Sequence, residues 1–559
     1  MNPFLKSVLK FKGSFLKSEF DRVTDDPRYF QEKLLFDILK KNRNTRYGLK
    51  YDFGAIRDLS AFKKNVPIIT YEDITSHIED LKAGKTGILT RREPFMFNLT
   101  SGTSASPKFI PITASMQKKT SSLLIQWLYR ALSDHPGFLD DACLCVASAP
   151  VEGHTVSGKA FGSASGEIYK SLSFALKNSY AFPSPVLDVK DYELKYALMA
   201  RLALGRNVTF AATPNPITLV QIAKTIIRYH DEFIHAIRKG VIFSHLDLST
   251  LNCSKTVMDF LRTPLEPDPG RSDFLQYIAK NPQDFLPSRY WPSLKLIGCW
   301  LGGSMGYQID QLRDYFGSEV PVRDLGYLAS EGCMSLPITD HTSSGVLAIL
   351  NQYYEFVKEE DYENKTPSTL GCHELSKGKQ YKILLTNDNG LYRYDILDII
   401  EVTDFHRNTP VISFIRKTRD ILNITGEKLH VNHFIHVFEK IKMETGVCPL
   451  QFRVVPEFER LRYHIFLMFE KDISFEKIQN DFIGRIDFNL TDVNIEYRSK
   501  RLSGRLNPPC FHIMASDWEE NVKKKFYESK GRDIQYKWSA MSPDFQEIDR
   551  DHIQRSIGV

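Results

Sequence analysis

Residues 97–113 read FNLTSGTSASPKFIPIT, in which small and hydroxyl side chains fill a short loop between two β-type runs. Such a loop can turn its backbone N–H groups and the hydroxyls of Ser101, Thr103 and Ser104 toward a phosphate. Lys108 adds a mobile positive charge at the end of the loop. It is not a Walker A loop, because the Gly-Lys-Ser/Thr ending that opens a helix is missing. A Ser/Thr/Gly-rich linker has a similar composition, so the loop alone leaves both interpretations open.

The segments on either side of this loop predict an α/β domain. Val66–Thr70 is an extended run, and Tyr71–Leu81 after it has the apolar spacing of a helix. Ser115–Leu132 forms an amphipathic helix directly after the loop. Strand, loop, strand and helix in succession are typical of an α/β domain that binds its ligand where a loop meets a helix.

Length and composition bound the class of protein. A chain of 559 residues exceeds one ordinary core, so we expect two or three domains. An apolar content of 42% and a charged content of 25% are typical of a soluble globular protein. The formal charge of +5 is small, and no basic stripe with interleaved aromatic residues favours nucleic acid as a partner. No apolar run is long enough to form a transmembrane segment.

The cysteines and histidines give little support for a metal site. The eight cysteines are scattered without a Cys-x-x-Cys pair, which predicts a reducing, cytoplasmic location and disfavours a zinc ribbon. His430, His433 and His436 recur at three-residue spacing. Their span covers more than about one and a half helical turns, which spreads the outer rings apart. No cysteine or carboxylate cluster accompanies them, so a metal here is the less favoured interpretation.

The amino terminus predicts an amphipathic helix with two open roles. Met1–Arg22 carries Lys6, Lys10, Lys12 and Lys17 among apolar residues. It lacks a continuous apolar core and a small-residue cleavage site, so it is not a secretory signal. We expect a helix that packs on its own protein, and contact with a membrane surface is the alternative.

The middle of the chain brings a second motif at the end of a predicted strand. Residues 143–290 are mostly helical in pattern and include a predicted helix at Leu219–Arg238. A strand at Val320–Leu325 then runs directly into the loop Gly326–Gly332. An aromatic ring, a hydroxyl and a carboxylate at a strand end suit stacking on a base and binding of Mg²⁺. An ordinary loop has the same composition, so this motif is also ambiguous by itself.

A charged break at Arg416–Asp420 predicts a domain boundary. Before it come the strand Tyr381–Thr386, a turn at Asn387–Gly390 and a return strand at Leu391–Ile400. After it, the pattern predicts a smaller α+β unit. Its predicted helices cover residues 431–442, 475–488 and 518–530, and its predicted strands cover residues 450–455, 463–470, 493–497 and 511–514.

Taken in order, these segments resemble the Gretchen Hagen (auxin-responsive promoter) family of acyl-acid amido synthetases, which belongs to the acyl-adenylate-forming superfamily. The resemblance runs from about Tyr29 to Lys537. It rests on a phosphate-binding motif, an adenine and Mg²⁺ motif, a ribose motif, a hinge and a carboxy-terminal segment with a mobile lysine. In this chain they are matched by Thr100–Lys108, Tyr327–Glu331, Gly390–Asp398, Arg416–Lys428 and Gln535–Lys537. Five motifs in the same order and spacing are more specific than any one of them.

The resemblance implies both a fold and an activity. The fold is a large amino-terminal adenylate-forming α/β domain with mixed sheets at residues 1–415, a hinge at 416–430, and a small mobile α+β carboxy-terminal domain at 431–559. The activity is that of a ligase that uses ATP and Mg²⁺ to join a small carboxylic acid to AMP. The acyl group then passes to an amine, which the resemblance implies is that of an amino acid.

The resemblance also implies roles for individual residues. It places the ATP phosphates on Ser101, Gly102, Thr103, Ser104 and the catalytic Lys108. It assigns ATP binding to Tyr327, Ser330, Asp398, Lys417 and Lys428, with Tyr327 stacked on adenine and Asp398 accepting both ribose hydroxyls. Glu331 ligates Mg²⁺ in this scheme. Lys537, the second catalytic lysine, swings in to neutralise the α-phosphate and the substrate carboxylate.

The chain departs from the family pattern in two of the motifs. The phosphate loop is one residue shorter, with Ala105 and Ser106 where the family carries glycines. The ribose motif has Asp395 where the family has arginine and Leu397 where it has glycine. Leucine crowds the backbone there, and an aspartate that faces the ATP phosphates adds an unfavourable negative charge. Two alternatives therefore stay open: an adenylating ligase that passes the acyl group to a thiol such as coenzyme A, and a non-catalytic relative that retains nucleotide binding.

Overall fold

The structure is a computed structural model, and the chain forms two compact units that divide between Ile415 and Arg416. Each unit has its own hydrophobic core. No helix in the described part of the chain is long and apolar enough to cross a membrane. The structure describes residues 3–99, 108–147, 151–164, 166, 179–189, 191–243, 255–302, 309–362, 364, 366–418, 421–425, 427–530 and 538–558.

The first unit is rich in helices, many of which begin at a side chain that caps the first turn. Thr70 and Asp73 form a capping box at the start of α5, and Thr113 Oγ1 accepts from the Met116 N–H at the start of α6. The helices of this unit are α1 (Pro3–Val23), α2 (Pro27–Asn42), α3 (Arg46–Lys50), α4 (Leu59–Asn65), α5 (Tyr71–Lys82), α6 (Ala114–Asp134), α9 (Tyr192–Leu204), α10 (Pro216–Arg228), α11 (His230–Lys239), α12 (Lys255–Leu261), α13 (Pro269–Ala279), α14 (Pro287–Tyr290) and α15 (Ile309–Phe316).

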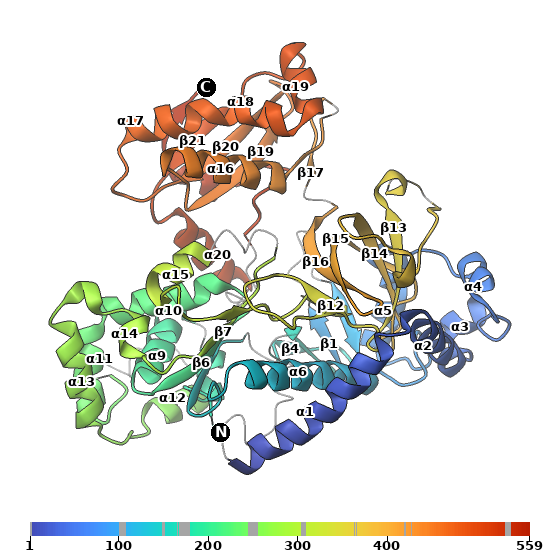
Figure 1. Cartoon of the computed structure of the whole chain (residues 1–559), viewed down its shortest axis with the longest axis horizontal. Helices are drawn as coiled ribbons and strands as arrows, with labels where there is room; N and C mark the ends of the chain where they lie inside the picture. The colour runs from blue at the N-terminus through green and yellow to red at the C-terminus, as the bar shows by residue number, and fades with distance from the viewer. Residues whose placement is uncertain are drawn as a thin grey trace. The chain divides into compact units, whose positions relative to one another are not determined.

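Three larger sheets organise this unit (Figure 1). The first has the order β2-β1-β5-β4, the second is the parallel sheet β3-β6-β7-β8, and the third is the six-stranded sheet β11-β12-β16-β15-β14-β13. The strands are β1 (Met96–Leu99), β2 (Phe109–Ile112), β3 (Ala142–Cys145), β4 (Gly153–His154), β5 (Ala160–Gly162), β6 (Val208–Ala212), β7 (Leu296–Gly298), β8 (Val322–Arg323), β9 (Leu328–Ala329), β10 (Gly332–Cys333), β11 (Ser335–Leu336), β12 (Gly345–Leu347), β13 (Tyr353–Lys358), β14 (Gln380–Thr386), β15 (Tyr394–His406) and β16 (Thr409–Lys417).

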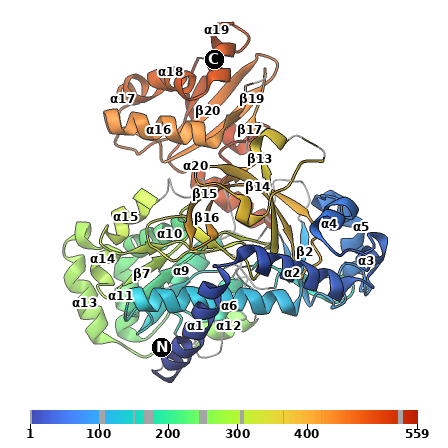
Figure 2. The same ribbon diagram turned by 45° about the vertical axis from the view of Figure 1, so that its right-hand side comes forward.

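Helix α6 joins the parallel sheet to the amino-terminal helix. Trp127 of α6 packs against Phe210 of β6, and its indole N–H donates to the Asp324 carbonyl directly after β8. Helix α1 packs against α6 and crosses it at an angle, as Figures 1 and 2 show. The close approach requires Gly13, because a Cβ there would come within 2.4 Å of Tyr129 Cβ. The predicted packing of the amino-terminal helix on its own protein is confirmed.

The second unit is a four-stranded sheet with helices on both faces: Phe452 contacts Phe438 on one face, and the next residue, Arg453, contacts Trp518 on the other. The sheet has the order β19-β20-β21-β22, in which only β20 and β21 run parallel. Helices α16 and α18 lie on one face of it (Figure 1). The elements are β17 (Ile421–Leu422), β18 (Leu429–His430), α16 (Val431–Thr445), β19 (Gln451–Glu457), β20 (Arg462–Met468), α17 (Phe475–Lys477), a π-helical turn (Ile478–Ile483), α18 (Gly484–Val493), α19 (Ile495–Leu502), β21 (Cys510–Met514), α20 (Trp518–Lys530), α21 (Glu547–Asp551) and β22 (Ile553–Ile557).

Three local predictions differ from the structure. The predicted strand at Val493–Tyr497 is wrong, because Asn494 ends α18 and its side chain caps the first turn of α19 by accepting from the Tyr497 N–H. The predicted helix Leu219–Arg238 is two helices that meet at Tyr229. The return strand predicted from Leu391 begins only at Tyr394, because Arg393 has a φ of +48°, outside the extended region.

Candidate active site

The predicted phosphate loop closes a β-hairpin. Strands β1 and β2 are antiparallel, with Leu99 directly opposite Phe109, so residues 100–107 connect the two strands. Those residues, including Ser101, Gly102, Thr103 and Ser104, lie outside the described part of the chain, and their phosphate binding stays a prediction. At the exit of the loop, Lys108 Nζ lies 5.3 Å from the centre of the Tyr71 ring, and Tyr71 Oη accepts from the Phe109 N–H at 2.8 Å.

Two motifs that are 71 residues apart in the sequence meet in the interior of the first unit. The Tyr327 hydroxyl donates to Asp398 Oδ2 at 2.6 Å. Tyr327 is 9% exposed and Asp398 is 3% exposed. Burial, together with the nearby carboxylate of Asp398, raises the pKa of Tyr327 well above its ordinary value, which keeps the phenol protonated and able to donate. The Tyr327 ring also contacts Phe414, with ring centres 5.4 Å apart.

Ser330 and Glu331 form the two-residue turn between β9 and β10, where Ala329 pairs with Gly332. Asn98 Nδ2 donates to the Ser330 carbonyl, and Ser330 Oγ donates to the Leu99 carbonyl, both at 3.4 Å. The start of the phosphate loop is therefore joined to the turn that carries Glu331. Asn98 Oδ1 is buried and has no hydrogen-bond partner among the described residues.

Three tyrosines lie within the electrostatic reach of the Glu331 carboxylate. In each, burial raises the pKa most, and the charge of Glu331 adds to the rise. They are Tyr71, Tyr327 and Tyr394. Since Tyr71 contacts Lys108, Tyr327 contacts Asp398, and Ser330 shares the turn of Glu331, the structure brings five of the predicted site residues into one region of the first unit.

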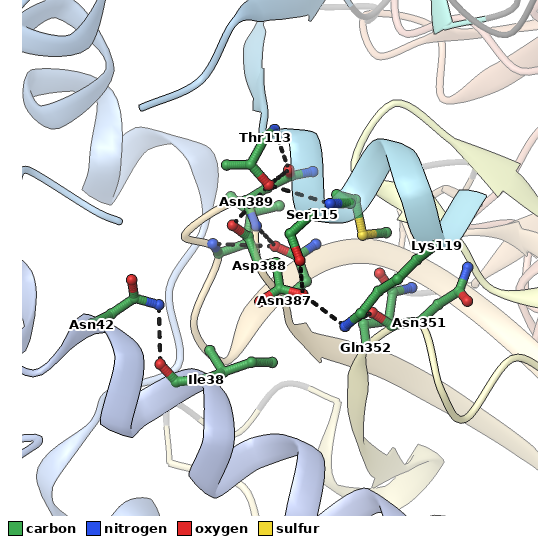
Figure 3. Close-up of polar contacts among 12 residues, drawn as sticks. Ile38, Asn42, Thr113, Ser115, Lys119, Asn351, Gln352, Asn387, Asp388 and Asn389 are labelled. Carbon is green, nitrogen blue, oxygen red and sulfur yellow. Dashed lines mark hydrogen bonds and ion pairs between the residues drawn. The ribbon is translucent and has the colours of Figure 1, made fainter. Parts of the chain in front are cut away.

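A buried polar network holds this region to the start of α6. Figure 3 shows Ser115 and Lys119 pointing from α6 toward Asp388, and Thr113 toward Asn389. Lys119 Nζ lies 2.7 Å from Asp388 Oδ2, and Ser115 Oγ donates to the same oxygen at 3.0 Å. The Thr113 N–H donates to Asn389 Oδ1 at 2.9 Å.

The turn at residues 387–390, which carries Asp388 and Asn389, also fixes the backbone of Glu331. Asn387 Nδ2 donates to the Glu331 carbonyl at 2.9 Å. Burial alone would raise the pKa of Asp388, but Lys119 and Ser115 hold it below its ordinary value, and the aspartate stays charged. From the sequence alone, residues 387–390 are predicted only to form a turn. The short polar side chains of this turn give no indication that Asp388 pairs with Lys119, which stands 269 residues earlier in the chain.

Asp324 is a further buried acid, and no motif in the sequence marks it. Its Oδ1 accepts from the Gly326 N–H and its Oδ2 from the Leu301 N–H, both at 2.6 Å. Burial raises the pKa of Asp324 to about 7, against the effect of these two backbone donors. Asp324 thus fixes the entry to the Tyr327 motif, where Gly326 has a φ of +96° and a Cβ would lie 2.7 Å from the Ser335 carbonyl.

The two residues of the ribose motif that differ from the family pattern, Asp395 and Leu397, form a hydrogen bond with each other. Asp395 Oδ1 accepts from the Leu397 N–H at 2.8 Å, and Lys382 Nζ lies 3.4 Å from Asp395 Oδ2. Burial raises the pKa of Asp395, and Lys382 opposes the rise. Leu397 has a φ of +63°, the left-handed conformation that glycine adopts most readily. The charge of Asp395 is therefore met by the chain's own lysine and backbone.

Arg393 fixes the ribose motif to neighbouring elements of the first unit. Its guanidinium forms a bidentate pair with the Glu355 carboxylate at 2.9 and 3.0 Å, and it also donates to the carbonyls of Lys63 and Val66. The Arg393 and Glu355 side chains are 6% and 1% exposed. Such a pair fixes the position of the motif, because separating the two side chains would leave an uncompensated charge in the interior at a high cost in free energy.

The remaining predicted residues belong to the second unit. Lys417 is exposed and is the last residue of β16, a strand of the first unit whose final two residues lie past the boundary between the units. Lys428 is also exposed, and its backbone N–H donates to Glu496 Oε2 at 3.2 Å. Lys537 lies outside the described residues. The next residue, Trp538, is fixed to β19, because its indole N–H donates to the Phe452 carbonyl at 2.6 Å.

Comparison with known proteins relates the chain to one family. Residues 16–322 match the model of the GH3 family N-terminal domain, and residues 345–417 match that of the GH3 family central domain. A jasmonoyl–L-amino acid synthetase (JAR4) of Nicotiana attenuata is 24% identical over 444 residues, which cover 77% of this chain and 76% of the relative. An indole-3-acetic acid-amido synthetase (GH3.4) of Arabidopsis thaliana is 23% identical over 541 residues, or 92% and 89% of the two chains.

Solved structures show the same fold. The AtGH3.15 acyl acid amido synthetase in complex with 2,4-DB superimposes with a TM-score of 0.84 at 21% identity, and the match covers 97% of both chains. A 2-hydroxyisobutyryl-CoA ligase in a postadenylation state has a TM-score of 0.52 at 11% identity, over 96% of this chain and 91% of that one. The predicted α/β fold class, with a large amino-terminal domain that contains mixed sheets, is confirmed.

Proposed function

Since the chain belongs to the GH3 family, we propose that it is an ATP-dependent acyl-acid amido synthetase that conjugates a small carboxylic acid to an amino acid. In the first step, a carboxylate oxygen attacks the α-phosphorus of ATP, and pyrophosphate leaves. In the second step, the amine nitrogen attacks the acyl carbon of the adenylate, AMP leaves, and the nitrogen loses a proton. The hydrogen bond between Tyr327 and Asp398 carries the proposal most directly, because it joins the adenine and ribose motifs in one place.

The residues of the first unit are proposed to bind ATP. Asp398 accepts the ribose hydroxyls, and the Tyr327 ring lies beside the base. Lys108, at the exit of the loop, adds positive charge to the phosphates, and Ser101, Gly102, Thr103 and Ser104 supply hydroxyls and backbone N–H groups to them. Positioning and charge stabilisation suffice here, because phosphorus chemistry needs little covalent help from the protein.

Glu331 fits the proposed Mg²⁺ ion. Mg²⁺ prefers oxygen ligands, and Glu331 offers a carboxylate in the turn whose Ser330 carbonyl accepts from Asn98 Nδ2. Asn98 Oδ1, a second oxygen, is buried and has no hydrogen-bond partner among the described residues. A bound Mg²⁺ would neutralise charge on the phosphates. Asn387 fixes the backbone of Glu331, so the carboxylate would be held in place before the ion arrives.

The second unit is proposed to contribute lysines. Lys417 and Lys428 add ATP contacts. Lys537 enters to neutralise the α-phosphate and the substrate carboxylate during the first step. Rotation about the hinge at 416–430 then exposes the adenylate to the amine, and closure keeps water away from it.

ATP–pyrophosphate exchange tests the first step. A panel of carboxylic acids is offered to the wild-type chain and to the Asp398→Ala and Lys537→Ala variants. We expect exchange with one class of acid and its loss in both variants. Asp404→Ala is the matched control, since Asp404 lies on the same strand β15 and pairs with Lys377 at the surface. Exchange that survives Lys537→Ala would remove this lysine from adenylation.

The acceptor assay separates the amido synthetase from the two alternatives. Amino acids and coenzyme A are offered with ATP and the activating acid, and the product is identified by mass. An amide supports the proposal, and a thioester supports an acyl-CoA ligase. ATP binding without exchange for any acid would support a non-catalytic relative, in which Asp395 and Leu397 are the residues to revert first.

The amino-terminal helix also has a face suited to a membrane surface. Phe4, Val8, Phe11 and Phe15 are exposed by 45–82% and recur at the spacing of one helix face. Lys10 and Lys12 are exposed on the same helix. We therefore propose that α1 contacts an anionic membrane surface, while a cytoplasmic location stays a prediction from the cysteine pattern.

A further inference from the structure

Two neighbouring strands of the second unit bring two histidines and a cysteine together. His464 lies on β20, and Cys510 and His512 lie two residues apart on β21, so they share one face of that strand. The strands are parallel, with His464 opposite Cys510. All three side chains are buried, with exposed fractions of 7%, 0% and 5%.

The three side chains turn ligand atoms toward one another. One ligand atom of each lies within 4.8 Å of the other two. His464 Nδ1 lies 2.8 Å from His512 Nε2, and Cys510 Sγ lies 3.6 Å from the same His512 nitrogen. Within the described residues, no other group of three or more histidine, cysteine or acidic side chains converges in this way.

The outer nitrogen of each imidazole is held by a second polar group. His464 Nε2 lies 2.8 Å from Glu457 Oε2, and Arg462 Nε donates to the same carboxylate oxygen at 2.6 Å. His512 Nδ1 lies 2.7 Å from Ser556 Oγ on β22. A carboxylate or hydroxyl behind a histidine is how proteins orient imidazoles that bind metal ions.

We propose that His464, Cys510 and His512 bind a single Zn²⁺ ion inside the second unit. Imidazole nitrogen and thiolate sulfur are the donors that Zn²⁺ prefers, and water or a ligand from outside the cluster completes a tetrahedron. With Zn–N near 2.1 Å and Zn–S near 2.3 Å, tetrahedral geometry separates the nitrogens by about 3.4 Å and nitrogen from sulfur by about 3.6 Å. Cys510 Sγ already has this separation from His512 Nε2, and the two imidazole nitrogens, now 2.8 Å apart, need to part by only about 0.6 Å.

The protons balance without any further reactant. In the metal-free cluster, His464 Nε2–H donates to Glu457, His512 Nε2–H donates to His464 Nδ1, and the Ser556 hydroxyl donates to His512 Nδ1. When Zn²⁺ binds, the Cys510 thiol releases one proton. His512 changes tautomer, so that Nδ1–H donates to Ser556 Oγ and Nε2 is left for the ion. The net change is one Zn²⁺ bound and one proton released.

The site would fasten β20 to β21 within the core of the second unit. The sequence could not reveal it, because His464 stands 46 residues before Cys510, whereas zinc motifs are recognised by close spacing. The visible signal is a Cys-x-His pair on one strand, which becomes a site only once the neighbouring strand supplies the second imidazole.

Metal titration of the full-length protein tests the proposal. The chain is stripped with a chelator and titrated with Zn²⁺ against a chromophoric competitor, and then with Co²⁺ in a separate experiment. We expect one equivalent of Zn²⁺ and, with Co²⁺, the absorption bands of a tetrahedral site with a thiolate ligand. Both should be lost in Cys510→Ser and at least tenfold weakened in His512→Ala.

Cys448→Ser is the matched control, because Cys448 is in the same unit and outside the cluster. It should bind Zn²⁺ as the wild-type chain does. X-ray absorption of the wild-type Zn²⁺ complex needs no variant and should show one sulfur near 2.3 Å and nitrogen ligands near 2.1 Å. Three results would each overturn the proposal. They are a Zn²⁺ coordination shell that contains only oxygen and nitrogen, a titration that shows no tight Zn²⁺ binding, and Zn²⁺ binding that is unchanged in Cys510→Ser.

Discussion

At the scale of single residues, Leu397 carries a backbone strain that can be measured. Its φ of +63° places a Cβ in the left-handed region, which costs a non-glycine residue about 1 kcal/mol. We expect Leu397→Gly to unfold with a free energy about 1 kcal/mol higher than Leu397→Ala, the reverse of the usual order in a strand. Thermal or urea unfolding of the two variants checks this, and an alanine variant as stable as the glycine variant would contradict it.

Asp324 predicts a dependence of stability on pH. Burial raises its pKa from 3.8 to about 7, so between these values the folded protein keeps a proton that the unfolded chain has released. The free energy of unfolding should therefore fall as the pH rises from about 4 to about 7, and level off above.

Comparison with Asp324→Asn isolates this effect from other titrating groups. Relative to the wild type, the variant should gain thermal stability as the pH rises from 4 to 7, with no further gain above 7, because its side chain never acquires a charge. A constant difference between the two midpoints across this range would show that the buried carboxyl does not titrate there.

At the scale of elements, the Arg393–Glu355 pair links the ribose motif to β13 and to the segment before α5. Glu355→Gln keeps the shape of the side chain but leaves the Arg393 charge buried without its counter-ion. We expect a loss of about 3 kcal/mol in the free energy of unfolding. Glu360→Gln, just after the same strand and exposed, should change stability by less than about 0.5 kcal/mol. Equal effects of the two substitutions on the urea midpoint would refute the anchoring role.

The exposed face of α1 gives a second prediction for an element. Phe11→Glu combined with Phe15→Glu should weaken sedimentation with phosphatidylserine vesicles at least tenfold, because each buried phenylalanine is worth about 2 kcal/mol. Tyr277→Glu, another highly exposed aromatic residue, is the control and should leave sedimentation unchanged. If the double variant and Tyr277→Glu sediment equally with the vesicles, α1 does not contact the membrane surface and only packs on α6.

Local sequence patterns predict the helices and strands well, but they do not predict which of these elements contact one another. The periodicity predicted α20 with its observed limits. It failed at Val493–Tyr497, where a single asparagine cap outweighs the β-type composition. The Lys119–Asp388 pair, the buried Asp324 and the His464–Cys510–His512 cluster depend on which distant strands become neighbours. Nothing in a local pattern encodes that, whereas the resemblance to a family did indicate that Tyr327 and Asp398 share a site.

At the scale of the whole molecule, the proposed chemistry divides between two separately cored units. Lys108, Tyr327, Glu331 and Asp398 belong to the first unit, while Lys417, Lys428 and Lys537 belong to the second. No single rigid arrangement is required to serve both adenylation and attack by the amine. Under the proposed mechanism, movement of the second unit would allow Lys537 to act in one step and leave for the next.

This division predicts a change in the separation of the two units during turnover. Fluorophores on unnatural amino acids at Val156 and Leu502, which are 98% and 82% exposed, report on the first and second units respectively. We expect energy transfer to change when ATP, Mg²⁺ and the activating acid are added together, and again when the amine acceptor follows. Asp398→Ala should show neither change, because it cannot hold the ribose. Constant transfer in a wild-type chain that performs exchange would mean that both steps run in one arrangement, and Lys537 would then have to reach the α-phosphate without any rotation about residues 416–430.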